Sequence, residues 1–277
     1  MAKWPTHEEV VEKVEALEIP FSPLGVDPYG ASKRHLALWA TPMAWLYRNY
    51  FSVRVFGSEH VPARGRAMLV GHHSGGVALD GALLITSMLL DHHPPRLAQG
   101  MAEKFLNRVP FSSAITSRVG QLTGLPEHAR RLLEDDRLLV VFPEGARGTA
   151  KLYPQRYDLV QFGTGFMRLA MATGTPIVPV AFNGVGEAIP TVFNSKRLGK
   201  LVGAPYVPFT PYLLPIPRKV PVQIYIGKPL VFDGDDGAPD HEIEANVAQV
   251  KSVIAELIRL GVDRRQTGEF DLPIHWP

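Results

Sequence analysis

Hydrophobic and polar positions along the chain alternate between the spacing of strands and the spacing of helices. Apolar runs typical of strands occur at 51–56, 67–70, 96–102, 137–142, 175–182 and 220–226. Helical spacing or composition occurs at 8–18, 34–50, 80–90, 104–122, 127–134 and 159–173, and again in a late segment with Ile243, Val247, Val250, Ile254 and Leu257. Because strands and helices alternate, we predict an α/β fold in which helices flank a mostly parallel central sheet.

The sequence shows no feature that would divide it into several domains. It shows no internal repeat, low-complexity tract or clear linker, and its 277 residues with 45% hydrophobic content suffice for a substantial core. We therefore predict a single α/β domain over 51–277, preceded by a helical segment over 1–50. In that segment Trp39, Trp45 and further aromatic residues lie among Arg34, His35 and Arg48, which suits a helix at the headgroup boundary of a membrane. A helix packed on the domain would explain the same pattern, and both interpretations stay open.

No stretch reaches the roughly 20 consecutive apolar residues of a membrane-spanning helix. Two segments are nevertheless strongly apolar, of which 36–47 is too short and contains Pro42, while 201–217 contains five prolines. The N-terminal sequence lacks the apolar core and cleavage site of a secretory signal. We therefore expect a cytoplasmic protein that binds peripherally at the cytoplasmic face of a membrane.

Charge and cysteine content exclude several classes of function. The 29 Lys and Arg residues nearly balance 27 Asp and Glu, so the net charge of +2 gives no bulk reason to expect a nucleic-acid partner. Without cysteine the chain has no disulfide framework, no thiolate zinc site and no cysteine nucleophile. The histidine pairs lack the i, i+4 spacing of a metal-binding helix, so we expect no metal and no cofactor.

The strand predicted at 67–70 runs directly into the sequence GHHSGGVALD. This sequence places His72 and His73 at the carboxyl end of a strand, where α/β sheets hold their sites. A histidine titrates near neutral pH and can accept the proton of an attacking hydroxyl. A nearby carboxylate would fix the ring tautomer and stabilise the imidazolium, and Asp80 is the candidate. Either histidine could instead cap a helix or pair inside the core, and for His72 we favour this structural interpretation.

The strand predicted at 137–142 ends in the sequence PEGARG, which brings a carboxylate, a flexible backbone and a guanidinium to one end of the sheet. Arg147 could hold a phosphate or carboxylate of a substrate in a bidentate fork. Glu144 could hold Arg147 or an acceptor hydroxyl. A surface turn with a local ion pair would also explain the motif.

A third motif, PIVPV, lies in the strand predicted at 175–182. Its two prolines each remove a ladder donor, which predicts a position near an edge or a bulge of the sheet. Taken together, the three motifs stand at strand ends in the order HSGG and Asp, then FPEGARG, then PIVPVAFNG. In this order they resemble the glycerolipid (lysophospholipid) acyltransferase superfamily.

This resemblance implies a fold like that of glycerol-3-phosphate acyltransferase and a role for each motif. In the family, the histidine of a His-x4-Asp motif is the base, the Phe-Pro-Glu-Gly block helps to bind the acceptor, and the proline-containing block lies near the acyl-donor site. By resemblance these roles pass to His73, Glu144, Gly145, Arg147 and Pro179. The family's second block usually offers a Gly and an Arg, for which Lys104 and Arg108 are the candidate substitutes here.

The spacing of the histidine motif departs from the family. Six residues rather than four lie between His73 and Asp80, and Ala78 holds the usual position of the carboxylate. In this respect the sequence is similar to the monoacylglycerol and diacylglycerol acyltransferases, in which the turn is longer. If the turn loops out, Asp80 reaches the histidine; if it does not, the orienting group is unknown. Ser74 lacks the Gly-x-Ser-x-Gly elbow of a nucleophile, so we assign it a turn or oxyanion-contacting role.

The resemblance implies an O-acyltransferase that moves a fatty acyl group from acyl-CoA or acyl-ACP to a hydroxyl of a glycerolipid or another lipid alcohol. His73 is the expected base, and no covalent intermediate is needed. The acceptor stays open between a lysophosphatidate, a neutral glyceride and a long-chain alcohol. The alternatives are an esterase or thioesterase and a catalytically inactive lipid-binding module. A positive rim for CoA phosphates, or else a solvated face, is expected from Lys104, Arg108, Arg118, Arg130, Arg131, Arg147, Lys151 and Arg156.

Overall fold

The computed structural model describes residues 7–102, 116–201, 203–234 and 237–277. In this part of the chain the strands are β1 (Arg54–Phe56), β2 (Ala67–Gly71), β3 (Ala98–Ala102), β4 (Leu122–Thr123), β5 (Leu138–Val141), β6 (Ile177–Asn183), β7 (Phe193–Ser195), β8 (Val207–Phe209) and β9 (Gln223–Ile226). The α-helices are α1 (His7–Glu15), α2 (Lys33–Trp45), α3 (Leu79–Leu90), α5 (Pro126–Glu134), α6 (Ala146–Thr149), α7 (Gly165–Thr173), α8 (Val185–Ala188), α9 (Lys196–Leu201) and α10 (Asp240–Thr267).

The central sheet has seven strands in the order β1-β9-β6-β2-β5-β3-β4. The strands from β6 to β4 in this order are parallel to one another, whereas β9 runs antiparallel to β6. The central strands β2 and β5 consist of apolar residues and glycine and are almost wholly buried, as expected for parallel strands covered on both faces. The predicted α/β domain with a mostly parallel sheet and flanking helices is confirmed.

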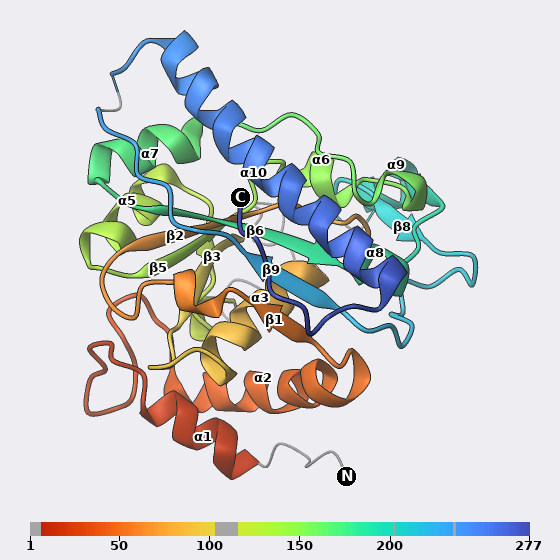
Figure 1. Ribbon diagram of the computed structural model, residues 1–277. Helices are drawn as coiled ribbons and strands as arrows, with labels where there is room; N and C mark the ends of the chain where they lie inside the picture. The colour runs from red at the N-terminus through yellow and green to blue at the C-terminus, as the bar shows by residue number, and fades with distance from the viewer. Residues whose placement is uncertain (1–6, 103–115, 202, 235–236) are drawn as a thin grey trace.

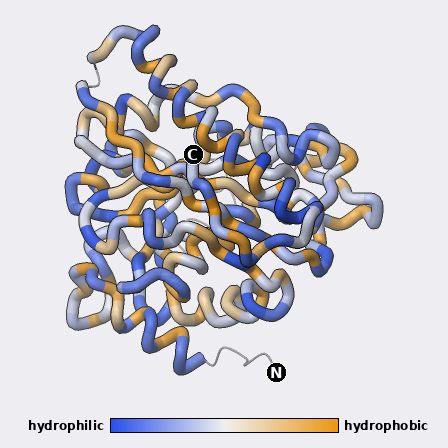
Figure 2. Tube along the Cα trace, viewed as in Figure 1, coloured by the Kyte–Doolittle hydropathy of each residue, from blue (hydrophilic) through white to orange (hydrophobic). Residues whose placement is uncertain are grey.

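Helices cover both faces of this sheet (Figure 1). One hydrophobic cluster joins α1, α2 and α3 to one face, and a second joins α5, α7 and α10 to the other. Helix α10 shows the predicted apolar stripe, because Ile243, Val250, Ile254 and Leu257 are fully buried. Figure 2 shows hydrophobic positions along the central strands and alternating hydrophilic and hydrophobic positions along α10.

Strand β6 differs in part from the prediction made for its prolines. It lies inside the sheet between β9 and β2, so the expected edge position is wrong. The expected bulge is present, however. Val180 pairs with Ile226 and Ile177 pairs with Leu230, so two residues of β6 face three on the neighbouring segment. The carbonyl of Pro179, in this irregular stretch, accepts a hydrogen bond from Gly227 N–H over 2.8 Å.

Two other observed elements begin at residues different from those predicted. Leu122 begins β4 instead of ending a helix, and the rest of the predicted helix at 104–122 lies largely outside the described residues. Helix α7 begins at Gly165 instead of residue 159.

The N-terminal helices pack on the domain. Leu36, Ala40 and Ala44 of α2 are buried in the cluster shared with α3, and Trp39 is partly buried against it. Leu38 is 67% exposed on the outer side of α2. Contact of this segment with a membrane, and a domain boundary near residue 50, stay predictions. Within the described part of the chain, no helix is both long and apolar enough to cross a membrane.

Candidate active site

Two neighbouring parallel strands carry the first two motifs to the same edge of the sheet. The register of β2 and β5 sets Val70 opposite Val141. Because His73 and Glu144 each follow these paired residues by three positions, they emerge side by side. The backbone N–H of His73 donates to Oε2 of Glu144 over 2.9 Å. The sheet register therefore brings the histidine and PEGARG motifs into direct contact.

The segment after His73 loops out before α3 begins. Gly75 and Gly76 have φ angles of 96° and 74°, in the left-handed region that a residue with a Cβ rarely adopts. The loop returns Asp80 in the first turn of α3, where its Oδ1 lies 2.9 Å from Nδ1 of His73. The contact expected across the longer turn is thus present.

Asp80 is fully buried and holds the loop as well as the imidazole. Its Oδ2 accepts the backbone N–H of Ser74 over 3.1 Å, and its Oδ1 accepts that of Gly81 over 2.8 Å. Because the carboxylate is an acceptor, Nδ1 of His73 carries the proton and Nε2 keeps its lone pair. Nε2 has no hydrogen-bond partner among the described residues. This is the tautomer that a general base requires.

The face of the imidazole rests on an aromatic ring. Phe142 stacks on His73 with a centroid distance of 4.1 Å and an interplanar angle of 12°. A Cβ on Gly81 would lie only 3.2 Å from the Phe142 ring, so the first turn of α3 closes tightly over it. The His73 ring is therefore fixed at one edge by Asp80 and on one face by Phe142. His73 retains 7% exposure.

Glu144 is a buried structural acceptor in this arrangement. Its Oε1 accepts the N–H of Val160 over 2.9 Å, and the ammonium of Lys151 lies 2.8 Å from its carboxylate. Lys151 also donates to the carbonyl of His73 over 2.7 Å. Glu144 and Lys151 therefore clamp the backbone of His73 from both its N–H and its carbonyl side. The sequence offered no sign of this role for Lys151.

The burial of Lys151 corrects the expectation of a positive rim. This lysine is 3% exposed and cannot face CoA phosphates from the surface. Burial lowers its pKa, and the neighbouring Glu144 carboxylate opposes that shift. Arg156 is also engaged, because it pairs with Glu187 at 3.0 Å and stacks on Tyr153. Arg108 lies outside the described residues.

Gly148 fills the corner where the clamp and the histidine meet. A Cβ at this position would lie 2.5 Å from Oε2 of Glu144 and 3.0 Å from Cβ of His73. The second glycine of PEGARG is therefore required because the backbone here lies close to Glu144 and His73. The sequence motif alone indicated no role for Gly148.

Arg147 lies apart from Glu144. Its guanidinium is exposed and donates to the side chain and the carbonyl of Gln161 over 3.3 and 3.2 Å. The pairing of Glu144 with Arg147 that the sequence suggested is absent, because Lys151 occupies the carboxylate. Substrate binding by Arg147 stays a prediction.

The remaining predicted residues take different positions. Ser74 is buried, and its hydroxyl has no hydrogen-bond partner among the described residues. Gly145, with φ 55° and ψ −145°, immediately precedes α6 and donates its N–H to the carbonyl of Phe142. Pro179 is buried opposite Val70 in β6. Lys104 lies outside the described residues. The roles of all four in binding substrate stay predictions.

His72 points into the core, but among the described residues it makes neither the helix cap nor the polar pair that the structural interpretation expected. Its side chain is fully buried beside Phe182, and neither ring nitrogen has a hydrogen-bond partner within the described residues. Burial lowers the pKa of His72 well below 6.5, and the positive charge of Lys151 adds to this effect. No group of three or more His, Asp or Glu side chains that could hold a metal occurs in the part of the chain that the structure describes.

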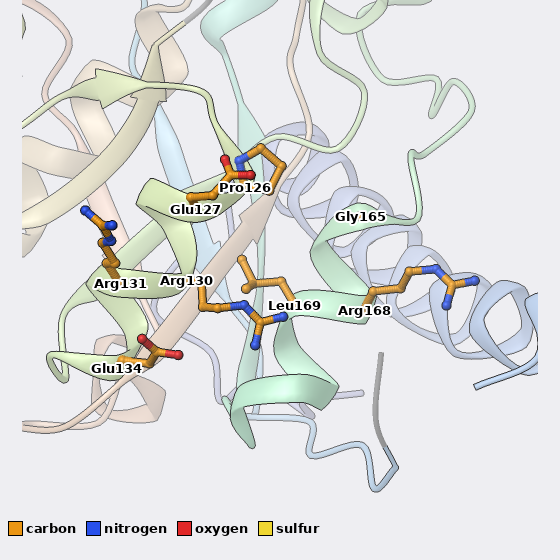
Figure 3. Close-up of a pocket in the computed structure, with 8 residues that line it drawn as sticks. All are labelled: Pro126, Glu127, Arg130, Arg131, Glu134, Gly165, Arg168 and Leu169. Carbon is orange, nitrogen blue, oxygen red and sulfur yellow. The ribbon is translucent and has the colours of Figure 1, made fainter. Parts of the chain in front are cut away.

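A cavity of about 610 Å³ lies between α5 and α7 (Figure 3). Its lining combines acidic and basic side chains and contains none of the residues of the histidine site. The lining residues are Pro126, Glu127, Arg130, Arg131, Glu134, Gly165, Arg168 and Leu169. We therefore place the candidate active site at His73 and not in this cavity.

Comparison with known proteins identifies the class to which this fold and site belong. The family model described as Acyltransferase matches residues 52–183, which span both the His73 and the Glu144 motifs. The chain belongs to this family.

Three known proteins show the extent of the similarity. An uncharacterized protein of Mycobacterium tuberculosis is 31% identical over 257 residues, covering 87% of this chain and 70% of the relative. The human "DGAT1/2-independent enzyme synthesizing storage lipids" is 24% identical over 83% of this chain and 66% of its own length. The crystal structure of the 1-acyl-sn-glycerophosphate (LPA) acyltransferase PlsC from Thermotoga maritima superimposes with a TM-score of 0.52 at 18% identity. That match covers 82% of this chain and 78% of PlsC, and it confirms the fold.

Proposed function

We propose that this protein transfers a fatty acyl group from acyl-CoA or acyl-ACP to a hydroxyl of a glycerolipid or another lipid alcohol. The observation that carries the proposal is the contact of 2.9 Å between His73 Nδ1 and Asp80 Oδ1, which leaves Nε2 as a proton acceptor. We place the reaction at the cytoplasmic face of a membrane, where such acceptors reside.

The proposed step needs only the side chains already described. The acceptor O–H gives its proton to Nε2 of His73 as its oxygen attacks the thioester carbonyl carbon. The C–S bond of the tetrahedral intermediate then breaks, and the thiolate leaves with the proton from the imidazolium. Asp80 stabilises that imidazolium while it exists. The protein supplies no covalent link to the acyl group and no cofactor.

Additional residues are proposed to bind the two substrates. Arg147 presents an exposed guanidinium that suits a phosphate or carboxylate. The buried Ser74 hydroxyl is a candidate donor to the oxyanion. Glu144, Gly145, Pro179 and Lys104 keep the substrate-binding roles that the family resemblance implies.

The test is thiol release from a panel of acyl-CoAs and acyl-ACPs, each with lysophosphatidate, monoacylglycerol, diacylglycerol or a long-chain alcohol. The name of the human relative is a reason to include the neutral glycerides. We expect acceptor-dependent release together with an acylated lipid product. Release at the same rate without acceptor would indicate a thioesterase, and no release from any pair would indicate a lipid-binding module.

A further inference from the structure

A long segment beyond β6 carries no negative charge. Between Glu187 and Asp233 the sequence contains no Asp or Glu. It contains six basic residues: Lys196, Arg197, Lys200, Arg218, Lys219 and Lys228. All six are exposed, and the ion pairs of the described residues include none of them. Their positive charges therefore face the solvent and are not neutralised by any of these ion pairs.

The same segment exposes an unusual amount of apolar surface. Among the described residues, fifteen large hydrophobic side chains are exposed, and eight of them fall within 192–216. These are Val192, Phe193, Leu198, Leu201, Tyr212, Leu213, Leu214 and Ile216. We call these eight residues, together with Lys196, Arg197, Lys200, Arg218 and Lys219, the apolar-basic face. Such a concentration marks an interaction surface more often than isolated exposed residues do.

Backbone hydrogen bonds hold this face as one unit. Strands β7 and β8 pair, and Val192 N–H donates to the carbonyl of Phe209 over 2.8 Å. The 210–217 loop is closed by Leu213 N–H to Thr210 and by the Thr210 hydroxyl to the carbonyl of Leu214. Arg218 N–H returns to the carbonyl of Ala188 over 2.8 Å. The exposed side chains thus project from an ordered support.

The support is joined to the segment that clamps His73. Asn194 donates to the carbonyl of Ala150 over 2.6 Å, and Tyr153 N–H donates to the carbonyl of Thr191 over 2.7 Å. Ala150 directly precedes Lys151, whose ammonium holds the His73 carbonyl. Figure 1 shows α9 and β8 at the same end of the sheet as α6 and α8. The apolar-basic face therefore adjoins the candidate active site.

We propose that the apolar-basic face docks the protein on a bilayer that contains anionic phospholipid. Exposed leucines and aromatic residues enter the interfacial region of a bilayer, while lysines and arginines are attracted to anionic headgroups. The absence of acidic residues removes the repulsion that would oppose this docking. The inference rests on the proposed function in one respect, because docking there brings the lipid acceptor to His73.

This location differs from the α2 segment that the sequence suggested. Trp39 and Trp45 are partly buried in the structure, and Leu38 is the large exposed hydrophobic residue of α2. The two locations make different predictions for substitutions, so one experiment separates them.

The experiment is sedimentation of the full chain with phosphatidylcholine vesicles, with and without 30% phosphatidylglycerol, in the absence of any acyl donor. We expect binding to the anionic vesicles that weakens as salt is raised. Lys196→Gln/Arg197→Gln/Lys200→Gln is expected to weaken the partition coefficient on the order of 100-fold, because each basic residue contributes about fivefold. Leu213→Ser/Leu214→Ser/Ile216→Ser is expected to weaken it at least as much. Thermal melting of each variant checks that it is folded.

Matched controls come from other surfaces. Arg131→Gln/Arg259→Gln removes exposed charge elsewhere, and Leu38→Ser removes an exposed apolar side chain of α2. Both are expected to bind like the parent. The proposal is overturned if folded variants of the apolar-basic face bind anionic vesicles as well as the parent, if Leu38→Ser alone loses binding, or if the parent binds no anionic vesicle. A dimer that loses its association with the triple-serine variant would assign this face to a second copy instead. No outcome depends on acyl transfer, so a failure here is distinct from a failure of the proposed reaction.

Discussion

Oδ1 of Asp80 lies 2.9 Å from Nδ1 of His73, although six residues separate the two along the chain. The two glycines of the intervening loop adopt left-handed φ angles, and the buried carboxylate also accepts the backbone N–H of Ser74. The longer turn therefore delivers the contact that a shorter motif would make directly.

Asp80→Asn tests the importance of this contact. An amide can accept from Nδ1 or donate to it, so the ring is no longer held in one tautomer, and no charge stabilises the imidazolium. We expect kcat for acyl transfer to fall by roughly 10²- to 10⁴-fold with little change in KM. Asp233→Asn, at an exposed carboxylate, is the control. An Asp80→Asn variant with the kcat of the parent would show that another group orients His73.

Lys151→Met tests the buried clamp. Removing the ammonium leaves the Glu144 carboxylate buried without its cation, so unfolding free energy is expected to fall by about 3–5 kcal/mol. Lys151→Met/Glu144→Gln is expected to recover part of the loss, since no isolated charge stays buried. Lys33→Met, which breaks the more exposed pair with Glu15, is expected to cost at most about 1 kcal/mol. Urea denaturation measures all three, and equal costs for the Lys151 and Lys33 variants would contradict the clamp.

Gly148→Ala tests the close approach at the corner of the site. The new methyl group would lie 2.5 Å from Glu144 and is expected to lower unfolding free energy by about 1–3 kcal/mol. The matched control is Gly165→Ala at the start of α7, where an added Cβ meets nothing within 4 Å. That change is expected to be neutral or to stabilise by up to about 1 kcal/mol. If thermal melts gave both variants the same change in melting temperature, the proposed steric crowding at Gly148 would be contradicted.

His72 is expected to make stability depend on pH. Its pKa is lowered in the folded protein, so below pH 6.5 the unfolded chain binds a proton that the folded chain does not. Stability is therefore fully present above pH 6.5 and falls as pH drops towards the folded pKa, by up to about 1.4 kcal/mol per pH unit. His72→Phe should remove this part of the slope. Urea denaturation between pH 5 and 7.5 measures it, and parallel curves for parent and variant would exclude the effect.

Much of the fold could be predicted from the sequence because the core residues recur at the spacings of strands and helices. The buried strands β2, β5 and β6 and the apolar stripe of α10 were all predicted near their observed limits. The β7–β8 pair was missed, since its strands have three residues each and Pro208 lies within one of them. Short strands of this kind give no alternating pattern.

The site was only partly predictable for a different reason. His73 and Asp80 are close in sequence and carry recognisable chemistry, so their contact could be proposed, although the longer turn left open whether Asp80 reaches the ring. The partners of Glu144 could not, because they are a buried lysine and the backbone N–H groups of His73 and Val160, which have no sequence signature. Arg147 was proposed as a partner of Glu144 only because it is nearby in the chain.

The most direct test of the account is acyl transfer by His73→Ala, measured as thiol release together with formation of the acylated lipid. If Nε2 of His73 takes the acceptor proton, turnover should fall by about 10²- to 10⁴-fold, with the melting temperature close to that of the parent. A folded His73→Ala variant that retained the acyl transfer of the parent would remove the proposed mechanism.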